Sequence, residues 1–366
     1  MRIVYGVFGY GRGHATRALG LLPELLRRHD VMVLAGADAK AALSPAYPVE
    51  EIPTLRFVYG RAGKRSNPET LRANFGAVWD LLTEGRRFRE IRERVRHFNP
   101  DVAICDADPW THRVAASLHV PRISLDHFGV LAYCRPPIDV ADRLRAQGDV
   151  RIYRTLMGRP ARIIVSSFYA LVPKSRRILS IGPILRDEVR AQRPSDGEHL
   201  LVYINNGASL LTPALEATLR ETRLPMRVYG VPRRGAEGAL DFRPPSTVGF
   251  LEDLASSRAV ISTAGNQLVG EAMSLGKPIL VCPEDSVEQR LNAAAVERMG
   301  IGMRVDRGQM TASTVLRFLA ETGRYRAAAL AQVRDGRAEA LAGLARFARQ
   351  LREVRRRLPA QAFGFA

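Results

Sequence analysis

Short apolar runs alternate with helical stretches along the whole chain, and this alternation restricts the possible fold more than any other feature of the sequence. Most runs are rich in Val, Ile and Leu and lead into a polar or glycine-bearing turn. Nearly continuous apolar runs are typical of strands buried on both faces, as in a parallel sheet. Strand–helix alternation predicts right-handed βαβ units and a doubly wound α/β fold. In the first half the predicted strands are Arg2–Phe8, Val31–Ala35, Asp101–Cys105, Arg122–Leu125 and Arg162–Ser166.

The alternation is interrupted between Pro173 and Gly197, where the chain is polar and broken by proline and glycine, and it then restarts. A length of 366 residues suits two domains better than one. We therefore expect one α/β domain over residues 1–185, a second over 198–335 and a C-terminal helical segment over 336–366. The strands predicted in the second half are Leu200–Ile204, Met226–Tyr229, Ala259–Ser262, Pro278–Cys282 and Gly302–Val305.

Two segments depart from this rhythm. Residues 56–68 are basic and contain glycine, which predicts a loop, and loops of this length in compact domains often serve function. Residues 325–358 are rich in Ala, Leu and Arg, which predicts one or two terminal helices with a solvated arginine face.

The composition is that of an ordinary globular protein, with 46% hydrophobic and 25% charged residues. No apolar run approaches the roughly 18 residues of a membrane span. The chain begins directly with a strand-like segment and lacks the shape of a signal peptide, so we expect a cytoplasmic protein. Its three cysteines form no CxxC pair, which argues against a zinc site or a disulfide framework. We expect no metal and no cofactor.

The net charge of +18 has two possible explanations. The simpler one is a solvated arginine coat. The other is a role in meeting anionic partners, such as a phospholipid surface or phosphate-bearing substrates. There is no nucleic-acid-binding motif, and aromatic residues make up only 7% of the chain. We therefore expect no nucleic-acid partner, and we leave a peripheral membrane contact open.

The first predicted strand leads into a glycine-rich turn that ends in a histidine. The turn contains Gly9, Gly11, Arg12 and Gly13, followed by His14, and a helix is predicted from residue 16 to residue 28. A dinucleotide fingerprint GxGxxG would need glycine at position 14, so this motif is not one. The loop formed by Gly11, Arg12 and Gly13 at a helix start is suited to a diphosphate or to an acceptor. An imidazole at this point can act as a general base.

The most informative stretch lies in the second half, over residues 260–293. A strand leads to Gly265, Asn266 and Gln267, which open a helix whose free amides could face a diphosphate. This arrangement can stabilise a leaving nucleotide diphosphate without a metal ion. A carboxylate, Glu271, follows in the same helix and is suited to ribose hydroxyls. After the next strand come Glu288 and Gln289, whose acid and amide groups suit sugar hydroxyls.

These residues resemble the donor-binding segment of GT-B glycosyltransferases. They resemble in particular the bacterial GlcNAc transferase of peptidoglycan lipid synthesis and the UDP-glucuronosyl/UDP-glucosyltransferases. The likeness is strongest over residues 247–302, whereas residues 40–160 resemble the family only in their alternation. The resemblance implies two Rossmann-like, doubly wound parallel-sheet domains facing a cleft. It also implies a C-terminal helix that returns to the N-terminal domain.

The resemblance implies a donor role for residues of the C-terminal half. Gly265, Asn266 and Gln267 would face the diphosphate and Glu271 the ribose, while the donor sugar would meet Glu288 and Gln289. Two further pairs carry over: Phe250 and Leu251, in the loop whose backbone reads the uracil edge, and Asn206 and Gly207, in a second glycine loop. The sequence has Ala264 where kin have glycine, and Leu268 where lipid-pathway relatives have a hydroxyl.

The reaction implied is an inverting, metal-independent transfer of a hexose or N-acetylhexosamine from a UDP-sugar to a hydroxyl. His14 would accept the proton, or else contact the diphosphate and the acceptor, and Asp106 or Asp108 would orient the His14 imidazole. Asp126-His127 is a second candidate pair. Asp108 followed by proline could equally just begin a helix. Asp106-Ala107-Asp108 also spells the DxD pattern of metal-using transferases, but it lies in the acceptor half.

Several alternatives stay open. The acceptor could be a small molecule or a lipid-linked sugar, and dTDP could replace UDP. A UDP-GlcNAc 2-epimerase shares the same architecture, and a basic protein that binds nucleic acid or membrane without catalysis is a third class of explanation.

Overall fold

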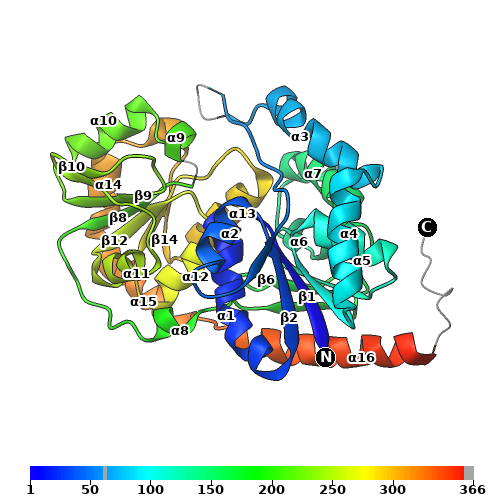
Figure 1. The fold of residues 1–366 in the computed structure, drawn as a ribbon. Coiled ribbons are helices and arrows are strands. Elements are labelled where there is room, and N and C mark those ends of the chain that lie inside the picture. Colours follow the sequence, from blue (N-terminus) through cyan, green and yellow to red (C-terminus); the bar gives the residue numbers. More distant parts are fainter. Residues whose placement is uncertain (61–63, 206, 358–366) are drawn as a thin grey trace. The chain divides into compact units, whose positions relative to one another are not determined.

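The computed structural model describes residues 1–60, 64–205 and 207–357 (Figure 1). The chain divides into two compact units. The first unit comprises Met1–Phe57, Pro68–Arg186 and Asp335–Ala366, and the second comprises Val58–Asn67 and Asp187–Arg334. A short piece of the N-terminal half therefore belongs to the second unit, and the C-terminal segment belongs to the first. No helix within the described ranges is long and apolar enough to cross a membrane.

The first unit is built on a seven-stranded sheet with the order β3-β2-β1-β4-β5-β6-β7, in which every pairing is parallel. The order reverses between β1 and β4, which makes this pair of strands the topological switch point. Its strands are β1 (Arg2–Val7), β2 (Asp30–Ala35), β3 (Val49–Glu51), β4 (Val102–Asp106), β5 (Arg122–Asp126), β6 (Arg162–Ser166) and β7 (Ile178–Ile181).

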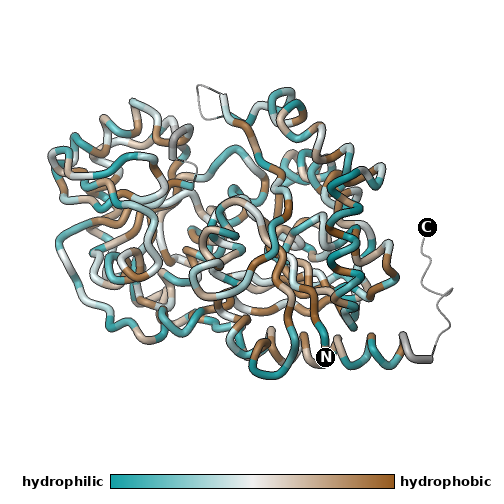
Figure 2. Tube along the Cα trace, in the orientation of Figure 1, coloured by the Kyte–Doolittle hydropathy of each residue, from teal (hydrophilic) through white to brown (hydrophobic). Residues whose placement is uncertain are grey.

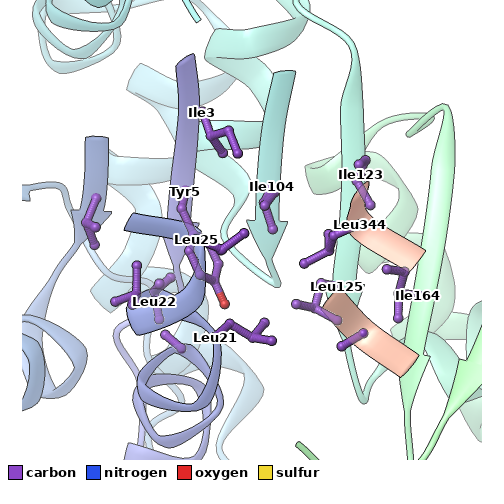
Figure 3. Close-up of a cluster of buried hydrophobic side chains, with 14 of the residues drawn as sticks. Ile3, Tyr5, Leu21, Leu22, Leu25, Ile104, Ile123, Leu125, Ile164 and Leu344 are labelled. Atoms are coloured by element: carbon purple, nitrogen blue, oxygen red, sulfur yellow. The ribbon is translucent and has the colours of Figure 1, made fainter. Parts of the chain in front are cut away.

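Helices cover both faces of this sheet because the side chains of each central strand alternate between two apolar cores. Figure 3 shows one core, where Leu21 of α1 and Leu344 of α16 face strand residues such as Ile104. The other core packs α4 and α5 against β1 and β4 through Val4 and Cys105. The helices are α1 (Arg12–Arg28), α2 (Ala37–Leu43), α3 (Asn67–Leu82), α4 (Arg86–Phe98), α5 (Pro109–Ser117), α6 (Gly129–Tyr133), α7 (Val140–Met157) and α16 (Arg337–Arg357).

The C-terminal helix α16 returns to the first unit, as the family resemblance implies. Ala340, Leu344, Phe347 and Leu351 are buried in the core that α1 shares. The start of the helix is fixed by the amide of Gly336, which donates to the carbonyl of Pro183 at 2.7 Å. Figure 1 shows the helix in red, running beneath the strands of the N-terminal sheet.

The second unit repeats the plan with the order β10-β11-β9-β8-β12-β13-β14 and a switch point between β8 and β12. All pairings are parallel except the edge pair β10–β11. Its strands are β8 (Leu200–Tyr203), β9 (Met226–Tyr229), β10 (Gly235–Glu237), β11 (Leu240–Phe242), β12 (Ala259–Ser262), β13 (Ile279–Val281) and β14 (Gly302–Arg304). Its helices are α8 (Asp187–Arg190), α9 (Gly207–Leu210), α10 (Pro213–Glu221), α11 (Thr247–Ser256), α12 (Asn266–Ser274), α13 (Val287–Arg298), the 3₁₀ turn η1 (Arg307–Gln309), α14 (Ala312–Ala320) and α15 (Thr322–Ala331).

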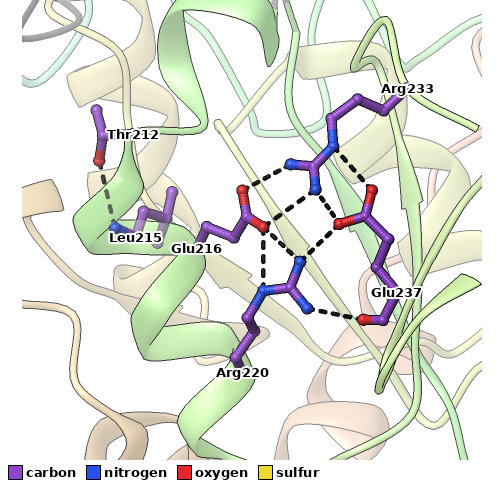
Figure 4. A network of polar contacts seen from close by, with 6 residues as sticks. All are labelled: Thr212, Leu215, Glu216, Arg220, Arg233 and Glu237. Carbon is purple, nitrogen blue, oxygen red and sulfur yellow. Dashed lines mark hydrogen bonds and ion pairs between the residues drawn. The ribbon is translucent and has the colours of Figure 1, made fainter.

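An ion-pair network holds the edge hairpin β10–β11 to helix α10 (Figure 4). Arg233 and Arg220 each bridge Glu216 and Glu237, with Arg233 Nη1 at 2.7 Å from Glu216 Oε2. The guanidinium of Arg233 also stacks on the ring of Phe242, 3.9 Å from its centroid. A network of this kind holds geometry better than an isolated surface pair, so it fixes the sheet edge.

In Figure 2, α4 and α16 mix teal with brown, as expected for helices with one buried face.

The structure differs from the sequence expectations in two segments. The stretch from Pro173 to Gly197, predicted as a connection, contains β7 and the short helix α8, and β7 completes the first sheet. Its few apolar residues are interrupted by polar ones, which hides a strand at the sheet edge. In the predicted loop over 56–68, Tyr59 and Arg65 form an antiparallel bridge, and the amide of Ser66 donates to the carbonyl of Val58 at 2.8 Å.

Candidate active site

The switch point of the first sheet brings the glycine-rich turn next to the end of β4. Val7 and Asp106 are register partners in the β1–β4 pair. The turn then leads into α1, which begins at Arg12, four residues earlier than the sequence predicts. Gly11 is the N-cap with φ of 77°, a left-handed conformation that favours glycine. Its amide donates to Asp38 Oδ2 at 3.0 Å, which fixes the turn.

His14 lies in the first turn of α1 and contacts Asp106. The distance from His14 Nδ1 to Asp106 Oδ1 is 2.7 Å. Arg17, one helical turn further on, donates through Nε to Asp106 Oδ2 at 2.8 Å and through Nη2 to Oδ1 at 2.6 Å. Asp106 is fully buried and Arg17 nearly so, whereas 23% of the His14 side chain is exposed. The three side chains form a buried ion pair with one accessible imidazole at its edge.

The charges in this cluster determine which nitrogen of His14 carries the proton. Burial by itself would raise the pKa of Asp106, but the charges and hydrogen bonds of Arg17 and His14 outweigh it and lower that pKa. Asp106 is therefore an acceptor at neutral pH. An ionised carboxylate can only accept, so in the 2.7 Å contact with Asp106 the Nδ1–H of His14 is assigned as the donor. That tautomer leaves the lone pair on Nε2, where a general base needs it.

The structure gives the other acidic candidates of this half different roles. Asp108 is the N-cap of α5, and its Oδ2 accepts from the amide of Thr111 at 2.7 Å. Asp126 accepts from the amide of Gly129 at 2.6 Å and from the Tyr153 hydroxyl at 2.5 Å. His127 Nδ1 lies 2.8 Å from the carbonyl of Ser166. Of the predicted orienting groups, it is Asp106 that contacts His14.

A run of aromatic rings extends from His14 through the glycine-rich turn. Phe8 packs edge-on to His14 with ring centroids 5.3 Å apart, and Tyr10 lies 6.5 Å from Phe8. Tyr10 in turn packs edge-on to Phe57 at 5.7 Å, and Phe57 is 41% exposed. The environment of the imidazole is therefore apolar on this side, apart from the Tyr10 hydroxyl.

The switch point of the second sheet has the same plan but other side chains. Ser262 at the end of β12 is the register partner of Tyr203 at the end of β8. The turn that follows passes through Ala264, whose φ of 67° is left-handed, and α12 then begins with Gly265 as N-cap. Asn292 of α13 donates from Nδ2 to the carbonyl of Ala264 at 3.0 Å and so holds the turn. No acidic side chain occupies the first turn of α12.

Gly265 differs from a glycine needed for packing. It has φ of −64° and ψ of 128°, which any residue adopts, and a Cβ built there would meet no atom within 4 Å. At Gly207, by contrast, a Cβ would lie 2.5 Å from the carbonyl oxygen of Gly230. Neither the backbone angles nor the packing of neighbouring residues therefore requires glycine at position 265. The absence of a side chain there leaves open space at the N-terminus of α12.

The remaining donor candidates of α12 and α13 are placed as follows. Asn266, Gln267 and Glu271 are all buried, and Gln267 Nε2 donates to Glu271 Oε1 at 3.3 Å. Glu271 is thus an interior carboxylate and not part of a solvated helix face. Glu288 and Gln289 lie in the first turn of α13, whose N-cap Ser286 accepts from the amide of Gln289 at 3.2 Å.

The predicted uracil-reading loop is a helix. Ser246 caps α11, so the amides of Phe250 and Leu251 fall within helical hydrogen bonding and cannot read a base edge. Leu251 is buried. The ring of Phe250 instead packs edge-on to Tyr203 and Tyr229, with centroids 5.7 and 5.1 Å away.

Of the second glycine-loop pair, Asn206 lies outside the described residues. Gly207 is the first residue of the short helix α9, and its amide donates to the carbonyl of Gly230 at 2.8 Å.

The structure adds residues that the sequence reasoning missed. Arg17 completes the His14–Asp106 cluster, and its spacing of three residues from His14 on a helix is the signal that could have found it. The Tyr59 hydroxyl donates to Glu284 Oε2 at 2.7 Å, which joins the residues of the Tyr59–Arg65 bridge to the loop between β13 and α13. No local pattern could indicate a contact between residues 225 positions apart.

Comparison with known proteins identifies the family. Residues 1–322 match the family described as Glycosyl transferase family 1. An uncharacterized glycosyltransferase of Methanosarcina acetivorans is 25% identical over 336 residues, covering 82% of this chain and 85% of that protein.

Solved structures show the same fold. Arabidopsis thaliana UGT89C1 complexed with UDP has a TM-score of 0.61 at 18% identity and covers 96% of this chain and 99% of its own. VinC in complex with dTDP has a TM-score of 0.62 at 14% identity, with 96% and 100% covered. The chain therefore belongs to glycosyl transferase family 1 and is a glycosyltransferase with the GT-B fold of two Rossmann-like domains.

Proposed function

We propose that this glycosyltransferase moves a hexose or N-acetylhexosamine from a UDP-sugar to a hydroxyl of a small-molecule or lipid-linked acceptor, with inversion and without a metal ion. The observation that carries the proposal is the 2.7 Å contact between His14 Nδ1 and the buried carboxylate of Asp106, which orients a partly exposed imidazole at a switch point. A base oriented in this way supports a single displacement, because direct attack by an activated hydroxyl inverts the anomeric carbon.

In the proposed reaction His14 Nε2 accepts the proton of the acceptor hydroxyl. The bond from the acceptor oxygen to the anomeric carbon forms while the bond from that carbon to the diphosphate oxygen breaks, and UDP leaves with the electron pair. Asp106 stabilises the imidazolium and holds its orientation. Arg17 keeps Asp106 ionised and so preserves its acceptor role.

The start of α12 is the proposed diphosphate site. Its first-turn amides and positive dipole end favour an anion, and the open space over Gly265 would admit one. The ring of Phe250 beside Tyr203 and Tyr229 offers an aromatic surface for a pyrimidine base. UGT89C1 complexed with UDP and VinC complexed with dTDP both carry a pyrimidine diphosphate, which supports this ligand class.

Metal independence is supported by what the two carboxylates of the DxD pattern already bind. Both oxygens of Asp106 accept hydrogen bonds from Arg17, and Asp108 caps α5. A pair engaged in this way does not present the free oxygens that Mg²⁺ or Mn²⁺ prefers. Charge on the leaving diphosphate would instead be stabilised by the amides and dipole of α12.

The acceptor is proposed to have an apolar or aromatic body around its hydroxyl. Phe8, Tyr10 and the half-exposed Phe57 would contact such a body next to His14. Residues of this kind discriminate poorly between apolar groups of similar size, so they indicate the class of acceptor and leave the particular compound open.

A thermal-shift panel of UDP-, dTDP- and GDP-sugars tests the donor, because a ligand that binds only the folded state raises the melting temperature. We expect stabilisation by a UDP-sugar, followed by UDP release that depends on an added phenolic or alcohol acceptor and by a product of inverted anomeric configuration in NMR spectra. Stabilisation by no nucleotide sugar would contradict the proposal. Conversion of UDP-GlcNAc without an acceptor would favour an epimerase instead.

A further inference from the structure

Helix α3 carries most of its large apolar side chains on its outer face. On the inner face, Leu81 is buried among core residues and Asn74 is fixed by hydrogen bonds to the backbone of Arg56. Four large apolar side chains lie on the outer face at spacings of 4, 4 and 3 residues. This set, called the α3 stripe below, is Leu71 (65% exposed), Phe75 (61%), Trp79 (60%) and Leu82 (46%).

The α3 stripe is a continuous surface and not a scatter of single residues. At 100° per residue, all four positions fall within one quarter of the helix circumference. The rings of Phe75 and Trp79 stack with centroids 6.1 Å apart and planes inclined by 24°. Exposed apolar side chains gathered in this way oppose folding in water, and on a globular protein they mark a surface that meets another apolar phase.

We propose that the α3 stripe docks this protein onto an anionic lipid membrane, with α3 lying in the interface. Tryptophan and phenylalanine are the side chains enriched at that depth. The exposed Arg72 follows Leu71 at the border of the stripe, and Arg86 (81% exposed) and Arg87 (50%) open the next helix four residues after Leu82. Arg86 lies 3.6 Å from Glu90 and Arg87 3.5 Å from Asp80, and both guanidinium groups stay exposed beside these acids. Apolar insertion flanked by arginines is the combination that binds an anionic headgroup surface.

Charge favours a lipid surface over a second copy of this chain. The net charge is +18, so two copies brought together at this face would repel each other, whereas an anionic bilayer would attract the protein over a distance of about 10 Å at 0.1 M salt. None of the helices in the described part of the chain could cross a membrane, so the contact would be peripheral. The inference does not rest on the proposed function, because docking requires no turnover.

The chain contains a natural probe for this contact. It has two tryptophans, of which Trp110 is fully buried and Trp79 lies in the stripe. We expect the emission of Trp79 to shift to shorter wavelength when vesicles of phosphatidylcholine and phosphatidylglycerol are added, and to be quenched by brominated acyl chains. Phosphatidylcholine vesicles should produce a much smaller shift. Trp79→Phe should abolish the shift while flotation with anionic vesicles persists.

Vesicle flotation with matched variants tests the residues. The double variant F75S/W79S should bind anionic vesicles at least about tenfold more weakly than the parent chain. The control L316S/L330S makes the same kind of change at exposed leucines of α14 and α15 (52% and 54% exposed) and should stay within about twofold. Melting temperatures measured without lipid should show that both variants fold, since the changed side chains are exposed.

Three outcomes would overturn the proposal. Equal binding of the parent and F75S/W79S, with no shift of Trp79 emission, would assign vesicle binding to the arginine coat alone. Failure of the parent to bind either vesicle would remove the lipid partner. Analytical ultracentrifugation showing a parent dimer that F75S/W79S converts to monomer would assign the stripe to a second copy of the chain.

Discussion

The two sheets share one strand order around their switch points, yet the residues at those points differ in kind. At the first switch point a histidine, a carboxylate and a guanidinium converge, with Arg17 and Asp106 buried and His14 partly accessible. At the second, no acidic residue occupies the first turn of α12 and the helix begins at a glycine with open space around it. The first switch point carries charged side chains in fixed positions, and the second carries the backbone amides of a helix start.

In the proposed function this difference assigns two tasks to one topology. Moving a proton needs a titratable group with a fixed orientation, which the buried pair with Asp106 gives to His14. Accepting a diphosphate needs many weak donors and room, which a helix start with small residues supplies. The fold places both sets at carboxyl ends of parallel strands, and the side chains decide which task each edge performs.

The largest effect is expected at the first switch point. His14→Ala should lower kcat by about 10²–10⁴-fold, because proton transfer in the transition state loses its acceptor. Donor binding should survive, since it is assigned to the second unit. Steady-state kinetics and a thermal shift with the donor measure the two effects separately. His97→Ala, at an exposed position of α4, is the matched control and should leave kcat unchanged. A fully active His14→Ala variant would show that His14 is not the base and that the first switch point does not carry the proton transfer.

Gly265→Val tests the second switch point and should weaken donor binding by about 10–100-fold, as expected when one or two charge-assisted hydrogen bonds are lost. The variant should fold normally, because the backbone angles suit valine and the space is open. Isothermal titration with UDP measures the loss. Gly323→Val in α15, where a Cβ also meets no atom, controls for the added side chain. Undiminished UDP binding by Gly265→Val would move the diphosphate site elsewhere.

How much of the fold the sequence predicts depends on strand burial. The central strands appear as continuous apolar runs because helices cover both of their faces, and all ten predicted strands are present within two residues at each end. The short strands β3, β7, β10 and β11 escape the pattern, since they have only three or four residues each and no residue of β3 or β10 is fully buried. Three or four residues that bury one face leave too short a periodic signal.

The same reasoning applies to the site. His14 and Asp106 are predictable because each follows a buried strand, and such residues meet at one edge. Arg17 was missed because it resembles the many solvated arginines of this chain, and only its three-residue spacing from His14 on a helix could have indicated it. The uracil-reading role of Phe250 was expected from a loop, and the cap at Ser246 turns that loop into a helix. Tyr59 is placed by tertiary structure alone.

A moderate effect is expected where Tyr59, of the Tyr59–Arg65 bridge, contacts the loop between β13 and α13. Tyr59→Phe removes the hydrogen bond to Glu284, in the loop that leads to Glu288 and Gln289. Loss of one such bond costs about 1 kcal/mol, so the donor KM should rise about fivefold with little change in kcat. Steady-state kinetics with varied donor measures it. Glu284→Ala removes the acceptor and should give a similar rise, and the double variant no more than either one. Fully additive effects would show that the pair does not act as a unit.

The smallest effect on activity is expected at Asp108, next to the charged cluster yet assigned to a helix cap. Asp108→Asn should keep at least about half of the activity, because asparagine caps helices as well as aspartate does.

Burial raises the pKa of Asp108 from its ordinary 3.8 to about 6, although the hydrogen bonds that its carboxylate accepts as a helix cap oppose this shift. The folded state therefore holds its proton longer than the unfolded chain. Stability from this group is complete below pH 4 and is lost as pH rises through 6.

The asparagine variant escapes this loss, so its stability relative to the parent should improve by about 2–3 kcal/mol between pH 4 and pH 7. Melting temperatures of both proteins at the two pH values measure the change, which should amount to about 5 °C or more in favour of the variant. The same substitution at Asp106 should behave in the opposite way. The pKa of Asp106 is lowered, so ionised Asp106 stabilises the folded parent at pH values above the ordinary pKa of an aspartate. The Asp106→Asn variant loses this stabilisation and also loses activity. If the two variants respond alike to pH, the contrast between an orienting carboxylate and a capping one is wrong.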